Sequence, residues 1–210
     1  MNYEIIGSRL LSPYLGASTY VWTSLIGVIL AALSLGYWLG GKIADKKPDL
    51  KILAFTIFLA GGFVSLTILL DDLILALIFQ SPVILEIKSV IAALLLFAPA
   101  SILLGFVTPF AARLKMSSLK NSGKTVGRLY ALSTVGSIVG TFLAGFLLIP
   151  FVGSRRTLYL IAASLIILSM LLAPFAVTKL NITILILFVS GVAASELSTY
   201  FLLKKVDLYD

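Results

Sequence analysis

Six long intervals without a charged residue constrain the fold of this chain more than any other feature. They cover residues 10–41, 52–70, 89–112, 129–154, 157–178 and 180–195. A membrane-crossing helix needs about 20 apolar residues. Each interval except the last reaches that length, and the last is expected to continue past Glu196. Charged residues make up 12% of the 210 residues, about half the share found in soluble domains. The sequence therefore predicts an all-α, polytopic membrane helix bundle with about six transmembrane helices.

The whole chain is expected to form a single transmembrane domain. Its spans are predicted near residues 16–41, 51–79, 83–112, 129–151, 157–178 and 180–203. Residues 1–15 are expected to form a short amphipathic segment at the membrane interface, because they carry the charges of Glu4 and Arg9. This opening has no basic start before an apolar core, so it does not fit a signal peptide. Pro99 and Pro109 predict a kink in the third span, since proline removes a backbone donor and crowds the preceding turn.

The basic residues predict how the spans are oriented. Cytoplasmic loops of membrane proteins carry an excess of Lys and Arg. One side of the predicted topology holds ten of the 16 bases, mostly in the loops 42–51 and 113–128, and the other side holds six. We therefore expect these two loops to face the cytoplasm from the cell membrane, with both chain ends outside if there are six spans. The net charge of +7 is then explained by these loops, and no nucleic-acid partner is expected.

Two segments carry small residues at helical spacings of three and four, which lets helix backbones approach closely in lipid. The first segment contains Gly36 and Gly40. The second contains Ser133, Gly136, Ser137, Gly140 and Ala144. Helix packing is the expected role of both segments. The alternatives are a sliding surface in a transporter and the contact face of a homodimer.

The residue types argue against catalysis by this chain alone. It has no cysteine and no histidine, which removes thiolate metal sites and the side chain best suited to proton transfer near neutral pH. The stretch before Thr125 resembles a phosphate-binding loop, but Ser118 stands where that loop needs glycine. We therefore expect no enzyme activity and no cofactor. Glu4, Arg9, Glu86 and Glu196 remain as ionisable residues that either line a pathway or lie at the membrane boundary.

The segment 41–51 resembles the loop between the second and third helices of major facilitator transporters. That loop has a glycine, three residues, an aspartate and then bases. Gly41, Asp45, Lys46 and Lys47 match it, while Pro48 and Asp49 replace its usual second glycine. In that family the aspartate and the bases make charge contacts that hold one gate state. The resemblance implies that Asp45 pairs with Arg113 or Arg128. The alternative is that these charges only end the membrane span.

A second resemblance covers nearly the whole chain. Residues 3–45, 108–114 and 127–157 are similar, in that order, to the membrane domain that is fused to spermidine synthases, which resembles half of a major facilitator transporter. That family has another apolar helix before the first block, and its synthase half has no counterpart in these 210 residues. The resemblance implies polyamine-related transport or the anchoring of an aminopropyltransferase partner. Six spans would place the chain end outside, whereas such a partner needs substrate from the cytosol.

In the transport version, carboxylates would have to bind the amines. The candidates are Asp71, Asp72, Glu86 and Glu196. The competing hypothesis is a structural membrane protein that does not transport and that oligomerises through its small-residue helix faces.

Overall fold

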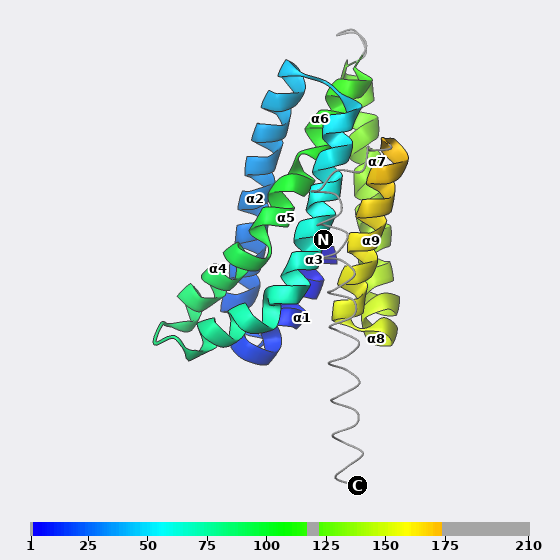
Figure 1. Ribbon diagram of the computed structural model, residues 1–210. Helices are drawn as coiled ribbons and strands as arrows, with labels where there is room; N and C mark the ends of the chain where they lie inside the picture. The colour runs from blue at the N-terminus through cyan, green and yellow to red at the C-terminus, as the bar shows by residue number, and fades with distance from the viewer. Residues whose placement is uncertain (1, 117–121, 174–210) are drawn as a thin grey trace.

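The computed structural model describes residues 2–116 and 122–173, and all regular structure within these two ranges is helical. The elements are α1 (Asn2–Leu15), α2 (Thr19–Lys46), α3 (Leu50–Gln80), α4 (Leu85–Leu96), α5 (Ala98–Gly105), α6 (Val107–Lys115), α7 (Ser122–Phe142), a π-helical segment (Leu143–Leu148), α8 (Ile149–Val152) and α9 (Ser154–Leu172). Figure 1 shows α3 between two groups of helices, with α2, α4 and α5 on one side and α7 and α9 on the other. The predicted all-α bundle is confirmed at this level.

Four of these helices are long and apolar enough to cross a membrane. They are Thr19–Lys46, Leu50–Gln80, Gly123–Val152 and Ser154–Leu172, and the bent helix pair from Leu85 to Lys115 makes a fifth if it is counted as one span. About six spans were predicted. The predicted sixth span, residues 180–203, and the end of the fifth lie outside the described residues.

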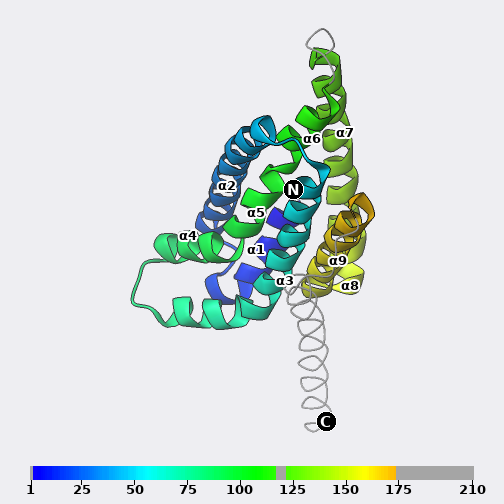
Figure 2. The same cartoon turned by 45° about the horizontal axis from the view of Figure 1, so that its top comes forward.

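The predicted third span is broken rather than straight. α4 and the helical stretch that follows it meet at an angle of 52°, and Figure 2 shows α4 turning away from α5. The break falls at Phe97, two residues before Pro99. Proline has no N–H to donate and its ring crowds the preceding turn, so the helix bends there. The kink expected at Pro99 is therefore present.

Polar side chains from two other helices satisfy the backbone at this break. The hydroxyl of Thr67 on α3 donates to the carbonyl oxygen of Leu96 at 2.6 Å, and the hydroxyl of Tyr3 on α1 reaches the same oxygen at 3.5 Å. The ring of Tyr3 also packs edge-on against Phe97, with the centroids 5.1 Å apart. A proline kink inside a membrane bundle is tolerated when neighbouring hydroxyls replace lost backbone bonds. These contacts hold α1, α3 and the kink together.

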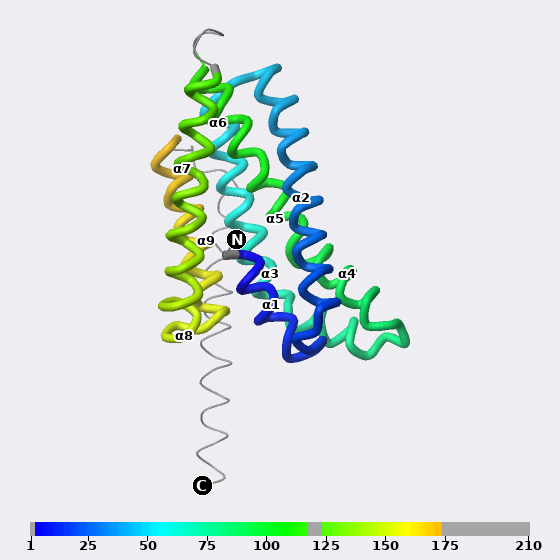
Figure 3. The backbone as a smooth tube through the Cα atoms, turned by 180° about the vertical axis from the view of Figure 1, so that it is seen from behind, coloured from blue at the N-terminus to red at the C-terminus, as the bar shows by residue number. Residues whose placement is uncertain are grey.

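α1 differs from the expected interfacial segment because it packs inside the bundle. Ile6 and Leu11 are fully buried, and Tyr3, Leu10 and Leu15 are nearly so. Figure 3 shows α1 beginning at about mid-height of the bundle and running toward the end where α8 lies. An amphipathic helix can lay its apolar face on a membrane surface or on other helices. Here α2, α3, α4 and α9 cover that face.

The π-helical segment compensates for a second proline. Pro150 cannot donate a backbone hydrogen bond to the turn before it. The N–H of Ile149 donates to the carbonyl of Ala144, five residues back, instead of following the α-helical register. Such local adjustments keep the backbone bonded in a membrane helix that contains proline. α7 therefore continues through Leu143–Leu148 into α8 as one long helical stretch.

Candidate functional site

Two aspartates and one arginine form an ion-pair cluster at one end of the bundle. Asp71 and Asp72 lie in the last third of α3, and Arg155 lies in the first turn of α9. Nη2 of Arg155 is 3.1 Å from Oδ2 of Asp71 and also bridges to Oδ1 of Asp72. Asp71 is only 2% exposed. A carboxylate buried this deeply is stable as an ion only when it is paired, so Arg155 is needed to hold Asp71 in place.

Local backbone structure brings Arg155 to this position. Gly153 has φ +92 between α8 and α9, a conformation that costs little only for glycine. The hydroxyl of Thr157 donates to the Gly153 carbonyl at 2.7 Å and fixes the start of α9. An arginine in the first turn of a helix is disfavoured by the partial positive charge there. The two aspartates of α3 offset that charge.

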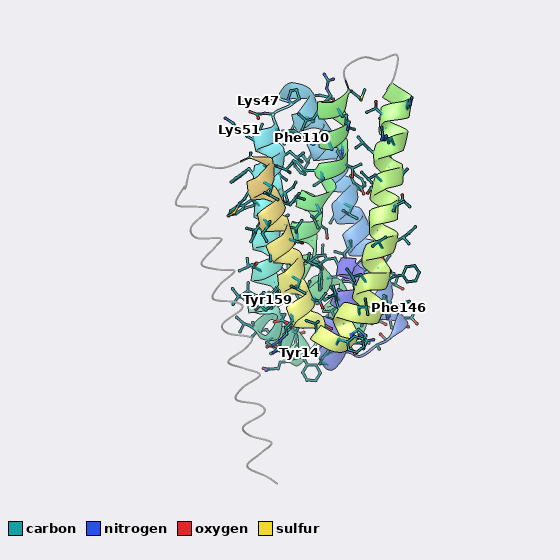
Figure 4. All side chains as sticks on the ribbon, turned by 90° about the vertical axis from the view of Figure 1, so that its right-hand side faces the viewer. Tyr14, Lys47, Lys51, Phe110, Phe146 and Tyr159 are labelled. Atoms are coloured by element: carbon teal, nitrogen blue, oxygen red, sulfur yellow. The ribbon has the colours of Figure 1, made fainter. Side chains whose placement is uncertain are left out.

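Tyr14 connects α1 to the same cluster. Its hydroxyl donates to Oδ1 of Asp72 at 3.2 Å. Partial burial and then the neighbouring Asp72 carboxylate raise the pKa of Tyr14 above its ordinary value. The phenol therefore stays protonated and acts as a donor. Figure 4 shows Tyr14 at the opposite end of the bundle from Lys47 and Lys51.

A cavity of about 570 Å³ opens beside this cluster. Its charged lining residues are Arg9, Asp71, Asp72, Arg155 and Arg156, three guanidinium groups against two carboxylates. The sequence analysis named Asp71 and Asp72 among the candidate carboxylates for binding amines. Both are already bound to Arg155, so a polycation would have to displace an arginine and enter a cavity with more positive than negative groups. The geometry disfavours amine binding here.

The opposite end of the bundle holds the loop that resembles the transporter motif. Nε of Arg113 lies 3.1 Å from Oδ1 of Asp45, which is one of the two pairings that the resemblance implied. The side chains are 45% and 75% exposed, so this pair is accessible to solvent and individually weak. The ion pair of Asp45 with Arg113 joins the end of α2 to the end of α6.

The other residues of this motif lie around the pair. Gly41 lies close to Pro109, whose Cβ would be 3.9 Å from an added Cβ. Lys46 and Lys47 are exposed at the end of α2, and Arg128 is exposed on α7. The described residues of both lysine-rich loops, 42–51 and 113–128, lie at this one end of the bundle (Figure 1).

The remaining ionisable candidates are dispersed. Glu4 is half-buried on α1, and Arg9 lines the 570 Å³ cavity. Glu86 lies in the first turn of α4, where a helix favours negative charge. Glu196 lies outside the described residues. Glu4, Arg9 and Glu86, the three of these residues that the structure describes, do not converge on one site.

Gly36 and Gly40 lie where two helices approach each other closely. A Cβ on Gly36 would be 2.1 Å from the carbonyl oxygen of Ile102, and a Cβ on Gly40 would be 2.7 Å from Cα of Phe106. Gly105 of α5 meets Gly36 in the same contact, with an added Cβ 2.9 Å from its Cα. The pair of glycines on α2 therefore has the packing role that its spacing predicted.

The small residues of α7 are arranged differently. Ser133, Gly136 and Ser137 are exposed, and Gly140 is half-buried. A Cβ on Gly136 would have no neighbour within 4 Å. Only Ala144, in the π-helical segment, is buried. Along the middle of α7, this face does not pack against another described helix of the chain.

Arg155 is the functional candidate that sequence reasoning missed. Its position between the predicted spans 129–151 and 157–178 puts it on the same side of the membrane as the end of the predicted span 51–79, near which Asp71 and Asp72 lie. Opposite charges at the same end of neighbouring spans were the available signal. Among the described residues, no group of three or more His, Cys, Asp or Glu side chains could hold a metal ion.

No protein-family model, no curated protein and no solved structure matches this chain.

Proposed function

We propose that this protein is an integral membrane module of the half-transporter type, and that a second copy of the chain completes it by packing along α7. Its expected role is polyamine-related transport or the anchoring of an aminopropyltransferase, as the resemblance to the membrane domain of fused spermidine synthases implies. A single half of a transporter cannot enclose a path for a substrate, so the transport role requires a second unit.

The observation that carries the proposal is the exposure of α7. Within the stretch Gly123–Val152, only 6% of the most apolar window is buried, although this window is about as hydrophobic as that of α3. Figure 4 shows Phe146 pointing away from the rest of the bundle. Lipid can cover such apolar side chains. Small side chains make few dispersion contacts with lipid. They allow a second helix to approach closely, and the dispersion contacts of that close approach drive helix association inside a bilayer.

Small residues already serve close helix packing within the bundle, where Gly36 and Gly40 let α2 approach α5 and α6 closely. Ser133, Gly136 and Ser137 form an equivalent face that no described helix of the chain covers. A face of this kind is self-complementary, so two copies related by a two-fold axis can pack through it. This supports a homodimer as the simplest assembly.

The test uses the absence of native cysteines. A single Ser137→Cys variant in membranes is expected to form a disulfide-linked dimer under mild oxidation, because a close crossing brings the two Cα atoms within about 7 Å. Val135→Cys is the matched control. It is exposed on the same helix, and two residues rotate it by about 200°. A Ser137→Cys chain that stays at 22.5 kDa, with a strictly monomeric mass in detergent, would contradict the assembly.

The transport role has its own test. Purified protein in lipid vesicles is expected to move spermidine or putrescine if the polyamine version is correct. Absence of flux from vesicles that contain the cross-linked dimer would leave anchoring as the proposed role. Co-purification of an aminopropyltransferase with the chain from native membranes is the expected result for that role.

A further inference from the structure

A second cavity, of about 420 Å³, lies at the basic end of the bundle, between the end of α6 and the beginning of α7. Its lining residues are Lys115, Lys124, Thr125, Arg128, Leu129 and Leu132. It is separate from the cavity beside Asp71, which lies at the opposite end. Neither the proposed dimer nor the transporter-like loop motif accounts for it.

The charges of this cavity all have one sign. Lys115, Lys124 and Arg128 contribute three cations, and no acidic residue is among the described residues that line it. The aspartates described at this end have other partners, since Asp45 pairs with Arg113 and the Asp49 side chain accepts the backbone N–H of Lys51. Three cations around one hollow repel each other, and a bound anion relieves that repulsion.

The wall of the cavity that lies further along α7 is apolar. Leu129 and Leu132 continue the lining along α7, away from the cations. Leu132 is 70% exposed, so this apolar wall is open to its surroundings. A free phosphate ion would use the cations and gain nothing from this wall. A molecule with an anionic head and an apolar tail would use both.

We propose that this cavity binds an anionic phospholipid. The phosphate of its headgroup lies among Lys115, Lys124 and Arg128, and an acyl chain lies along Leu129 and Leu132. Basic pockets between transmembrane helices are a known kind of site for anionic headgroups. The site lies at the end of the bundle where the positive-inside rule places the cytoplasmic leaflet, which is the leaflet with negative surface potential.

The test is a lipid titration of the full chain in neutral detergent, read by native mass spectrometry. Wild-type protein is expected to retain phosphatidylglycerol in preference to phosphatidylcholine. The double variant Lys124→Gln/Arg128→Gln is expected to bind phosphatidylglycerol about 30-fold more weakly, since each basic residue near an anionic surface contributes about fivefold. The control is Lys42→Gln/Lys51→Gln, which removes the same charge from exposed positions at the same end and is expected to match wild type.

Four outcomes would overturn the proposal or its acyl-chain part. Equal retention of the two lipids would show that the protein does not select the anionic headgroup. An equal loss of phosphatidylglycerol binding in the control variant would show that the net charge of this end, and not the cavity, attracts the lipid. Displacement of phosphatidylglycerol by inorganic phosphate would assign the cations to a soluble anion instead. Unchanged phosphatidylglycerol binding in Leu132→Gln would remove the acyl-chain part of the site. All four proteins are compared only if their size-exclusion profiles agree, and Lys124→Gln and Arg128→Gln are also tested singly.

Discussion

Arg155 shows how one residue can determine the stability of one end of this bundle. It holds the buried carboxylate of Asp71 and the half-exposed carboxylate of Asp72 together, and Tyr14 adds a third helix to the cluster. The ion pair of Arg113 with Asp45 at the other end has similar geometry but lies in solvent. The two pairs therefore differ mainly in burial, and burial sets the cost of removing one partner.

We predict that Arg155→Gln destabilises the protein by about 3 kcal/mol or more, because it leaves a buried charge without a partner. Arg113→Gln is the matched control and should cost less than about 1 kcal/mol. Thermal unfolding in detergent should separate them, with a drop of roughly 6–12 °C for Arg155→Gln. Adding Asp71→Asn to Arg155→Gln should recover part of the loss. Equal melting temperatures for the two single variants would argue against a structural role of the buried pair.

The sequence predicted the exposed ion pair but not the buried one. Asp45 and Arg113 were brought together by a resemblance to a known loop. Asp71 and Arg155 are 84 residues apart, and their contact depends on how α9 packs against α3. Charge alone also made Asp71 and Asp72 look available to amines, because a sequence does not show which counter-ion already occupies a carboxylate.

At the scale of helices, the kink and the short glycine contacts were predictable because their causes are local. Proline acts on its own turn, and two glycines four residues apart act on their own helix face. The hydrogen bonds that stabilise the kink were not predictable, since Thr67 and Tyr3 come from other helices. α1 was placed at the interface for a related reason. Its apolar face is visible in the sequence, but what covers that face is not.

We predict that Gly36→Ala destabilises the protein by roughly 1–3 kcal/mol, the usual cost of inserting atoms into a filled contact. The new Cβ would meet the Ile102 carbonyl oxygen at 2.1 Å, so α2 and α5 would have to separate. Gly27→Ala is the control on the same helix, where a Cβ has no neighbour within 4 Å. It should be neutral or stabilising by about 0.5–1 kcal/mol, because alanine favours helix over glycine. Melting curves in detergent would measure both, and a Gly36→Ala protein as stable as wild type would contradict the close contact.

At the scale of the whole molecule, the bundle has two chemically different ends. One carries the described bases of both lysine-rich loops and the Asp45–Arg113 pair, and the other carries Tyr14 and the Arg155 cluster (Figures 1 and 4). Along α3, 22 residues separate its N-cap Asp49 at the lysine-rich end from Asp71 in the Arg155 cluster, which is about 33 Å at 1.5 Å per residue. That length exceeds a hydrocarbon core of about 30 Å. The charge clusters therefore fit on opposite sides of a membrane.

The most direct test of this account is the accessibility of single cysteines at the two ends of α3 in intact cells. Lys47→Cys precedes α3 and Val83→Cys follows it, both at exposed positions in a chain without native cysteine. A membrane-impermeant maleimide is expected to label Val83→Cys in intact cells, and to label Lys47→Cys only after the membrane is opened. Labelling of both positions from the same side, or recovery of the protein in the soluble fraction, would contradict the claim that this bundle spans a membrane with its lysine-rich end inside.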